Sequence, residues 1–320
     1  MKKLVSLGVS AAILAIIYWT IDLSGLAAAF ARTDPVLLTG AILMVVPITG
    51  LTAWRLCRLV PDQAQLGLGR AVRMVLGASV LNMVLPAKMG DLAKFAFIRR
   101  GDDVSGALAF AVVIFEKTAD MLALLVWCAL GLFLFSGDPL LFKGLAVAVG
   151  SSVVAGSVLL ASKKTARLFF GICGRCAPGK LRPRIGHLAD SWDQMHDLFW
   201  NKKQFAFGIL AFSVFLWFLH LIQIWLFILA LGAPVPLLDS LALTPLAILA
   251  GLLPLTFAGV GTRDAALIFL YRPFMDPGTG AALGLLCTLR YILPALCGLP
   301  FFGGLWQEVR ANRPNSPTDG

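Results

Sequence analysis

Long apolar runs separated by short polar connections dominate the pattern of this chain. Each run holds about 17–30 residues, and a helix of that length crosses a bilayer core of roughly 30 Å. The pattern therefore predicts an all-α, polytopic integral membrane protein. Its full spans are expected at residues about 4–22, 36–54, 105–135, 140–161, 205–231 and 278–305.

Two apolar regions are interrupted by Pro, Gly and ionisable residues. Residues 81–95 read LNMVLPAKMGDLAKF, and residues 251–269 read GLLPLTFAGVGTRDAALIF. The apolar stretch before Pro86 is only 12 residues long, which gives a helix of roughly 18 Å. That is too short to cross the membrane, so both segments are predicted to be re-entrant broken helices. Paired breaks of this kind mark the substrate site of many transporters.

The composition excludes a soluble protein. The chain is 59% hydrophobic and 14% charged over 320 residues, whereas soluble domains are about 25% charged. The apolar segments use almost the whole length and leave no room for a soluble catalytic domain of about 100 residues. The protein is therefore expected not to be an enzyme.

The distribution of basic residues predicts the orientation in the membrane. Arg and Lys, with Arg55 among them, fall in alternate connections, which the positive-inside rule assigns to the cytoplasm. Both termini are then cytoplasmic, in the cell inner membrane. The two breaks enter from opposite faces, as in an inverted repeat. We expect one transmembrane domain over 1–320, with a first repeat at about 36–161, a basic loop at 162–204 and a second repeat at about 205–305.

The basic loop is predicted to be a partly amphipathic connector that faces lipid. Residues 174–180 outline a P-loop, but Leu181 stands where that motif requires Ser or Thr. The possible zinc ligands lack a recognised spacing and a second CxxC pair. They are Cys173, Cys176, His187 and His196. No cofactor, no metal and no nucleic acid is expected, and anionic membrane lipids are the expected partners.

Ionisable residues inside apolar segments are functional candidates, because each costs about 2.5–3.5 kcal/mol at the centre of a membrane helix. Arg290 is the sharpest case, since no carboxylate lies within one helical turn of it. Structural ion pairs, such as Asp91 with Lys94 and Arg263 with Asp264, are the alternative interpretation. His220 and Gln223 are weaker candidates, either for a cavity or for contacts between helices. The predicted substrate-binding set is Lys88, Asp91, Lys94, Glu116, Lys117, Asp120, Arg263, Asp264 and Arg290.

These segments resemble the flippase-like family of the lysylphosphatidylglycerol synthase transmembrane region. The similarity lies in the LPAKMGD stretch with Lys94, in the Glu116-Lys117 pair followed by Asp120, and in the Gly-rich break followed by Arg263 and Asp264. Lys94 and Lys117 stand where the family usually has Arg, and Asp264 where it usually has Glu. The soluble aminoacyl-transfer domain of the synthase is absent, so lysyl transfer is not implied.

The resemblance implies a lipid translocase for an anionic phospholipid or a polyprenyl-phosphate-linked glycolipid. Lys88, Lys94, Arg263 and Arg290 would hold the phosphate, and the carboxylates would orient them. One alternative is an ion- or proton-coupled carrier of a soluble anion. Another is a membrane-embedded enzyme for lipid-linked substrates, with Asp91 and Glu116 as acid and base. The pattern leaves open whether the chain forms a homo-oligomer.

Overall fold

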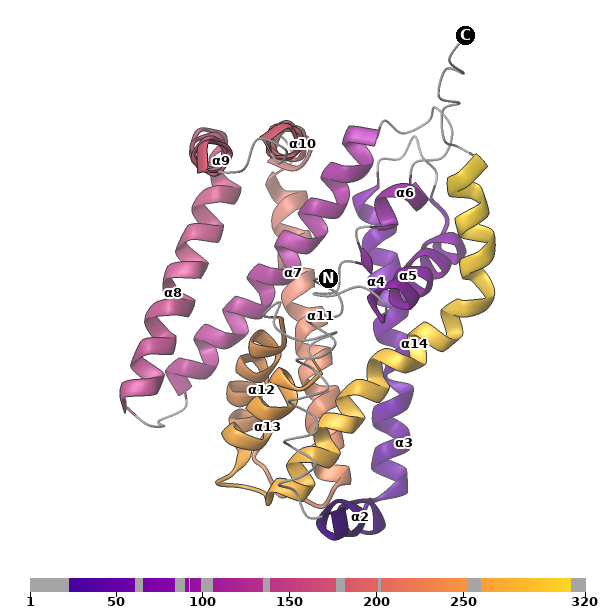
Figure 1. Ribbon diagram of the computed structural model, residues 1–320, viewed down its shortest axis with the longest axis vertical. Helices are drawn as coiled ribbons and strands as arrows, with labels where there is room; N and C mark the ends of the chain where they lie inside the picture. Colours follow the sequence, from indigo (N-terminus) through magenta and orange to yellow (C-terminus); the bar gives the residue numbers. More distant parts are fainter. Residues whose placement is uncertain are drawn as a thin grey trace.

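The computed structural model describes residues 23–60, 66–83, 90–91, 93–98, 106–134, 139–176, 182–200, 203–252 and 260–311. Every regular element in these ranges is helical, so the all-α prediction is confirmed for them (Figure 1). The helices are, in chain order, α2 (Leu23–Ala31), α3 (Pro35–Leu43), α4 (Val45–Leu59), α5 (Leu68–Asn82), α6 (Lys94–Ile98), α7 (Gly106–Leu134), α8 (Pro139–Ala161), α9 (Lys163–Cys176), α10 (Arg182–Trp200), α11 (Lys203–Ala230), α12 (Leu237–Leu252), α13 (Thr262–Tyr271) and α14 (Pro277–Ala311).

In Figure 1, α3, α8 and α11 run along the longest axis of the molecule, while α7 and α14 run obliquely to it. In the view of Figure 1, α9 and α10 are seen end-on at the upper end, while α2 lies across the lower end. The chain turns by 113° between the segments Ala146–Val158 of α8 and Lys163–Arg175 of α9. The bundle thus has two ends, one of them covered by the helices of the predicted basic loop.

Three helical segments in the described ranges are long and apolar enough to cross a membrane. There are four if the bent pair of α8 and α9 forms a single span. The three are Pro35–Leu59, Lys203–Ala230 and Pro277–Leu305, which match predicted spans. The segments at 105–135 and 140–161 are helical as α7 and α8. The first predicted span lies outside the described residues. The count of six spans is therefore not confirmed.

The helices that lead into the predicted breaks are short. α5 has 15 residues and α12 has 16, so each is about 22–24 Å long and shorter than a bilayer core. The breaks themselves, with Pro86, Lys88 and Pro254, lie outside the described residues. Re-entry of the two segments and the inverted repeat remain predictions.

Local chemistry explains several helix starts. Asp34 caps α3, where its side chain accepts from the amide nitrogens of Val36 at 2.8 Å and Leu37 at 3.1 Å, and Pro35 follows as the first helical residue. α13 begins after Gly261, whose φ of 101° suits a residue without Cβ. The Asp264 carboxylate accepts from the Gly261 amide at 3.0 Å. Asp34 and Asp264 therefore both act as helix caps, one at the start of α3 and the other at the start of α13.

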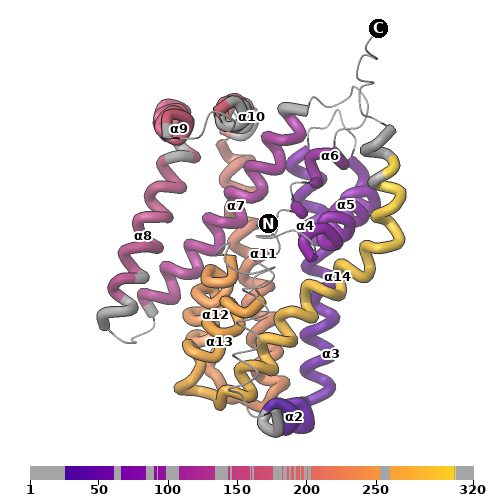
Figure 2. Tube along the Cα trace, in the orientation of Figure 1, coloured from indigo at the N-terminus to yellow at the C-terminus, as the bar shows by residue number. Residues whose placement is uncertain are grey.

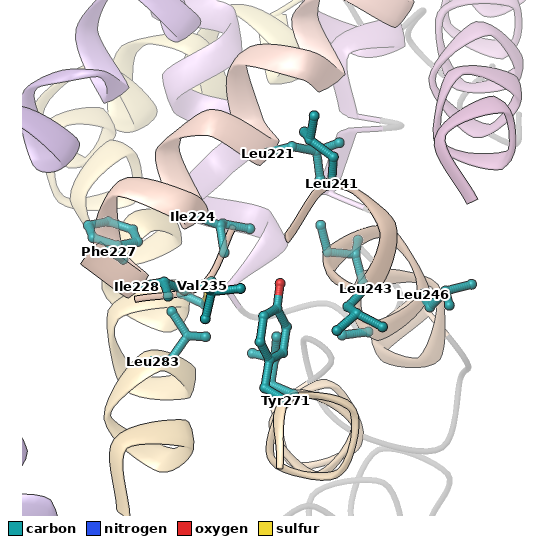
Figure 3. Packing of buried hydrophobic residues seen from close by; sticks show 14 of the residues in the cluster. Leu221, Ile224, Phe227, Ile228, Val235, Leu241, Leu243, Leu246, Tyr271 and Leu283 are labelled. Atoms are coloured by element: carbon teal, nitrogen blue, oxygen red, sulfur yellow. The ribbon is translucent and has the colours of Figure 1, made fainter. Parts of the chain in front are cut away.

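Two apolar clusters fill the bundle. One is built mainly from α11, α12, α13 and α14, and in it Tyr271 stands between residues of α11 and α12 (Figure 3). The Tyr271 hydroxyl lies 2.6 Å from Thr244 Oγ1, which satisfies its polar end. The other cluster is built mainly from α4, α5, α6 and α7.

Three long helices carry polar residues at the level between the two apolar clusters. On α7 these residues include Glu116 and Asp120, and on α11 they include His220. On α14, Arg290 and Tyr291 occupy this position. Asp120 is the middle residue of α7, and Tyr291 is the middle residue of the apolar segment Pro277–Leu305. A polar layer therefore crosses the bundle at mid-length.

The most extensive helix contacts join α14 to α5 and α12 to α7 (Figure 2). Each pair includes a glycine of the long helix that approaches the backbone of the short one. A Cβ on Gly298 would lie 2.2 Å from the Leu76 carbonyl oxygen, and one on Gly131 would lie 2.4 Å from that of Ala242. Glycine at these two positions lets the helices touch.

We expect Gly131→Ala and Gly298→Ala each to lower the free energy of unfolding by about 1–3 kcal/mol, because an added methyl group would push backbones apart. Gly150→Ala on α8 is the matched control, since nothing lies within 4 Å of its Cβ position. That control should be neutral or stabilising by up to about 1 kcal/mol. Thermal melts of the purified proteins in detergent measure the differences. Equal stability of all three variants would contradict the close contact.

Candidate binding site

A cavity of about 310 Å³ lies in the polar layer between the two apolar clusters. α4, α5, α7, α11 and α14 supply most of its wall. Ionisable groups and neutral hydrogen-bonding groups both face it. The polar lining residues are Thr49, Thr52, Arg55, Ser79, Asn82, Asp91, Lys94, Glu116, Lys117, Asp120, His220, Gln223, Thr288, Arg290 and Tyr291.

Arg55 joins α4 to α7 and α11. Its guanidinium donates to Asp120 Oδ1 at 2.6 Å and to Glu116 Oε1 at 3.1 Å. It also donates to Ser213 Oγ of α11 at 2.7 Å. Glu116 and Asp120 can share one arginine because residues four apart lie on the same helix face. Arg55 is 1% exposed, so it is a core residue of the bundle.

Two lysines extend the same network toward the first break. Lys94 donates to Glu116 Oε1 at 2.9 Å and lies 3.5 Å from Asp91 Oδ1. Lys117 pairs with Asp91 and lies 3.4 Å from Asp120 Oδ2. The cations Arg55, Lys94 and Lys117 thus face three carboxylates, so the network is electrically balanced. We call these six residues the ion network.

The turn of chain at Gly90 and Asp91 carries one of these carboxylates into the network. The Asp91 amide donates to Asn82 Oδ1 at 3.2 Å, which ties the turn to the end of α5. A Cβ on Gly90 would lie 2.3 Å from the Asn82 amide nitrogen. Glycine is therefore required for this close approach, as the Gly in the break suggested.

Arg290 differs from the other cations of the wall because its hydrogen-bonding partners are neutral. Its NH1 lies 3.1 Å from His220 Nδ1, and its NH2 donates to the Tyr291 hydroxyl at 2.5 Å. The guanidinium carbon also lies 4.6 Å from the centre of the Tyr291 ring. Arg290 is 4% exposed, and its Nε has no acceptor among the described residues. Among the described residues that line the cavity, Arg290 is thus a positive charge in excess of the balanced ion network.

Arg263 and Asp264 form a separate pair behind the wall. Arg263 NH2 donates to Asp264 Oδ1 at 2.6 Å, to the Gly284 carbonyl at 3.0 Å and to Thr288 Oγ1 at 2.7 Å. Neither member of the pair is among the described residues that line the cavity. Asp264 also caps α13, and the pair makes the ion contact that the structural alternative expects.

The structure brings six of the predicted site residues to one cavity and places two others outside its described wall. Lys88 lies outside the described residues, and Arg263 and Asp264 lie behind the wall. The six that line the cavity are Asp91, Lys94, Glu116, Lys117, Asp120 and Arg290. The predicted pairing of Asp91 with Lys94 is also present, as one contact of a larger network.

Sequence analysis missed Arg55 as a site residue and wrongly assigned it to a cytoplasmic connection. The predicted span stopped at residue 54, whereas α4 continues to Leu59 with Leu56 and Leu59 buried. Apolar residues spaced three apart beyond Arg55 were the signal that the helix goes on. His220 was a weaker candidate, and the structure places it against Arg290. Gln223 lines the cavity and also donates to the Ala41 carbonyl at 2.9 Å.

No group of three or more His, Cys, Asp or Glu residues that could hold a metal occurs among the described residues. The three carboxylates of the ion network are instead held by cations. Cys173, one of the zinc-like residues of the basic loop, carries a free thiol.

Comparison with known proteins gives two matches. The model of the family described as the lysylphosphatidylglycerol synthase TM region matches residues 3–298. The chain is also similar to the UPF0104 membrane protein MJ1595 of Methanocaldococcus jannaschii. The two are 25% identical over 240 residues, which cover 70% of this chain and 71% of that protein.

Proposed function

The chain belongs to the family of the lysylphosphatidylglycerol synthase transmembrane region, and from this and the cavity we propose that it translocates a lipid with an anionic, phosphate-containing headgroup. Arg290 is the observation that carries the proposal. A buried guanidinium in a cavity wall, with neutral partners and an Nε without an acceptor among the described residues, favours an anion as its missing counter-ion.

The ion network supports the same proposal by its balance. Its three carboxylates are matched by three cations, so they add no net charge that would repel an anion. Buried ion pairs seldom stabilise a fold strongly, because desolvation offsets the attraction. In a translocase such a network keeps a polar, hydrated path through the bundle, which lowers the barrier that a headgroup meets in hydrocarbon.

Neutral groups of the wall suit the oxygens of a phosphate or of headgroup hydroxyls. Thr49, Thr52, Ser79 and Asn82 line the cavity on the side of α4 and α5, and Thr288 lines it beside Arg290. Specific sites commonly combine apolar walls with a few such polar groups. A cavity of about 310 Å³ accommodates a headgroup and not a whole lipid, so the tails would remain in the bilayer.

The interpretation as an enzyme gains no support from the two carboxylates proposed as acid and base. Glu116 accepts from Arg55 and Lys94, and Asp91 pairs with Lys117 and Lys94. A carboxylate surrounded by cations acts as their counter-ion. Translocation without covalent change is therefore the function that we propose.

Reconstitution tests this function directly. We expect purified protein in liposomes to make a fluorescent anionic phospholipid of the inner leaflet accessible to dithionite, a quencher added outside, much faster than protein-free liposomes do. Mass spectrometry of the recovered lipid should find it unchanged. Uptake of free phosphate without lipid movement would favour a carrier of soluble anions, and a chemically altered lipid would favour an enzyme.

An inverted repeat is part of the proposal, and the helix packing supports it. α5 precedes the first break and packs on α14 of the second half, while α12 precedes the second break and packs on α7 of the first half. The two contacts also share a close glycine, Gly298 in one and Gly131 in the other. Such reciprocal contacts are expected when two halves are related by a pseudo-two-fold axis in the membrane plane.

We further propose that α9 lies on the cytoplasmic membrane surface among anionic lipids. Its exposed apolar residues are Leu168, Phe169 and Ile172, and exposed Lys164 and Arg175 flank them. The helix lies across the bundle end (Figure 1). Apolar and basic residues on one exposed helix favour binding at a lipid headgroup layer.

Ion pairs hold α9 against α10, which leaves the apolar residues facing outward. Lys163 pairs with Asp197, and Arg167 lies 2.7 Å from Asp193. The pairing with Lys163 lowers the pKa of the Asp197 carboxyl. Arg175 and Arg182 line a surface pocket of about 450 Å³ between the two helices, where lipid phosphates would find basic partners.

A bimane label at Phe169→Cys should be quenched strongly by brominated lipid in liposomes, because the side chain is expected to enter the bilayer. Gln194→Cys on α10 is the matched control, since it is exposed in a polar stripe with Asp190 and Asp197; its label should be quenched weakly. Both variants are made in a background without native cysteines. Equal quenching at the two positions would contradict the surface placement of α9.

A further inference from the structure

The contact between Arg290 and His220 restricts the protonation of the histidine. A guanidinium carries only donors, and an imidazolium also carries only donors. Because Arg290 NH1 lies 3.1 Å from His220 Nδ1, Nδ1 must be the acceptor. This contact fits a neutral imidazole whose proton is on Nε2.

The carboxylates in the same cavity wall as His220 form ion pairs with other cations. They pair with the arginine and the two lysines of the ion network. The His220 ring itself contacts Arg290, and the ring of Trp217 lies 5.6 Å away between centroids. The other charged or titratable groups of the wall are Arg55 on α4, Asp91 and Lys94 beside α5 and on α6, Glu116, Lys117 and Asp120 on α7, and Tyr291 on α14.

An anion at Arg290 changes what His220 can do. The bound anion replaces Nδ1 as the acceptor of the guanidinium and balances the positive charge that opposes a proton on the ring. Nδ1 is then free to bind a proton from water and to donate it to the anion. When the anion leaves, Arg290 again requires an acceptor, and the proton is released.

From this geometry we propose that His220 takes up one proton each time an anionic headgroup binds at Arg290, so that lipid translocation is coupled to proton movement. This inference rests on the proposed function. The proton forms an N–H bond at Nδ1, and no electron is transferred. The site would thus carry a phosphodiester anion together with one proton, and a proton gradient would drive the transport.

Isothermal titration calorimetry measures how many protons the protein takes up when it binds one lipid. The ligand is dihexanoyl phosphatidylglycerol, whose phosphodiester does not titrate near neutral pH, so any proton must come from the protein. Binding to the detergent-solubilised protein is measured in HEPES and in Tris, which differ in their ionisation enthalpy. The change in observed enthalpy between the buffers gives the protons bound. We expect about one proton per lipid, and an affinity that falls by up to about tenfold per pH unit as the pH rises.

His220→Asn is the decisive variant, because an amide oxygen can still accept from Arg290 but does not titrate. We expect this variant to bind the lipid with a proton count near zero and with little pH dependence. His196→Asn on α10 is the control, since His196 is not part of the cavity wall, and it should retain the wild-type count. Failure of the wild type both to bind and to move lipid would overturn the proposed function. Normal binding without proton uptake, or an unchanged count in His220→Asn, would overturn this inference alone.

Discussion

Arg290→Ala is expected to reduce lipid translocation by about 30-fold or more while leaving the protein folded. Removing one member of a buried charge pair typically costs about 2–5 kcal/mol of binding free energy, and about 1.4 kcal/mol corresponds to a factor of ten in rate. The fold should tolerate the change because the hydrogen bonds of Arg290 go to neutral side chains. His220 and Tyr291 each lose one hydrogen bond, worth about 1 kcal/mol.

The measurement pairs dithionite quenching in liposomes with thermal melts of the same preparation. Arg272→Ala is the matched control, because Arg272 is an exposed arginine that stacks on Phe269 outside the cavity. It should retain wild-type rates. Wild-type translocation by well-folded Arg290→Ala would remove this residue from the mechanism. A large loss of stability in Arg290→Ala would mean that its charge serves the fold.

All residues of the ion network except Arg55 were predictable, because ionisable residues are costly in an apolar segment. Glu116 and Asp120 lie four apart in a long apolar run, and this spacing alone places them on one face of a helix. Asp91 and Lys94 follow a glycine in a break, where irregular backbone must face protein or a cavity. These residues had to find partners inside the protein.

Which partners they find depends on helices far apart in the sequence. Arg55 lies one residue beyond the predicted end of its span, and helix ends are uncertain by several residues in any prediction from sequence. Its two carboxylates come from a helix more than 60 residues away. Arg290 and His220 were both noted as polar residues in spans, but their contact depends on how α11 and α14 cross, which no local pattern specifies.

Arg263 shows what a local motif leaves out. Its position after a Gly-rich break resembles that of Asp91 and Lys94, and the sequence therefore predicted that it binds substrate. The neighbouring Asp264 is instead the acceptor for the Gly261 amide at the start of α13, as an acidic residue at the third helical position often is. Arg263 donates to the Asp264 carboxylate and to the Gly284 carbonyl of α14, while its NH1 has no partner among the described residues.

Arg55→Ala is expected to lower the free energy of unfolding by about 3–5 kcal/mol, the range observed when one partner of a buried ion pair is removed. Arg55 is 1% exposed and holds Glu116 and Asp120 together. Without it, two carboxylates four residues apart on α7 lose their common partner on α4 and repel each other. The loss should exceed that in Arg290→Ala, whose partners are neutral, even though both residues are buried arginines in the same wall.

Two further variants separate charge from packing in this effect. Arg58→Ala, an exposed arginine one turn away on α4, should change stability by less than about 0.5 kcal/mol. The double variant Arg55→Ala, Asp120→Asn leaves Glu116 paired with Lys94 and Asp91 paired with Lys117. Its network is balanced again, so it should regain most of the lost stability, because the cost arises mainly from an unpaired carboxylate. Thermal and denaturant unfolding in detergent measures all three. If the double variant is as unstable as Arg55→Ala, the arginine stabilises the bundle through its packing against Ser213 and α11, and charge balance is not what the ion network provides.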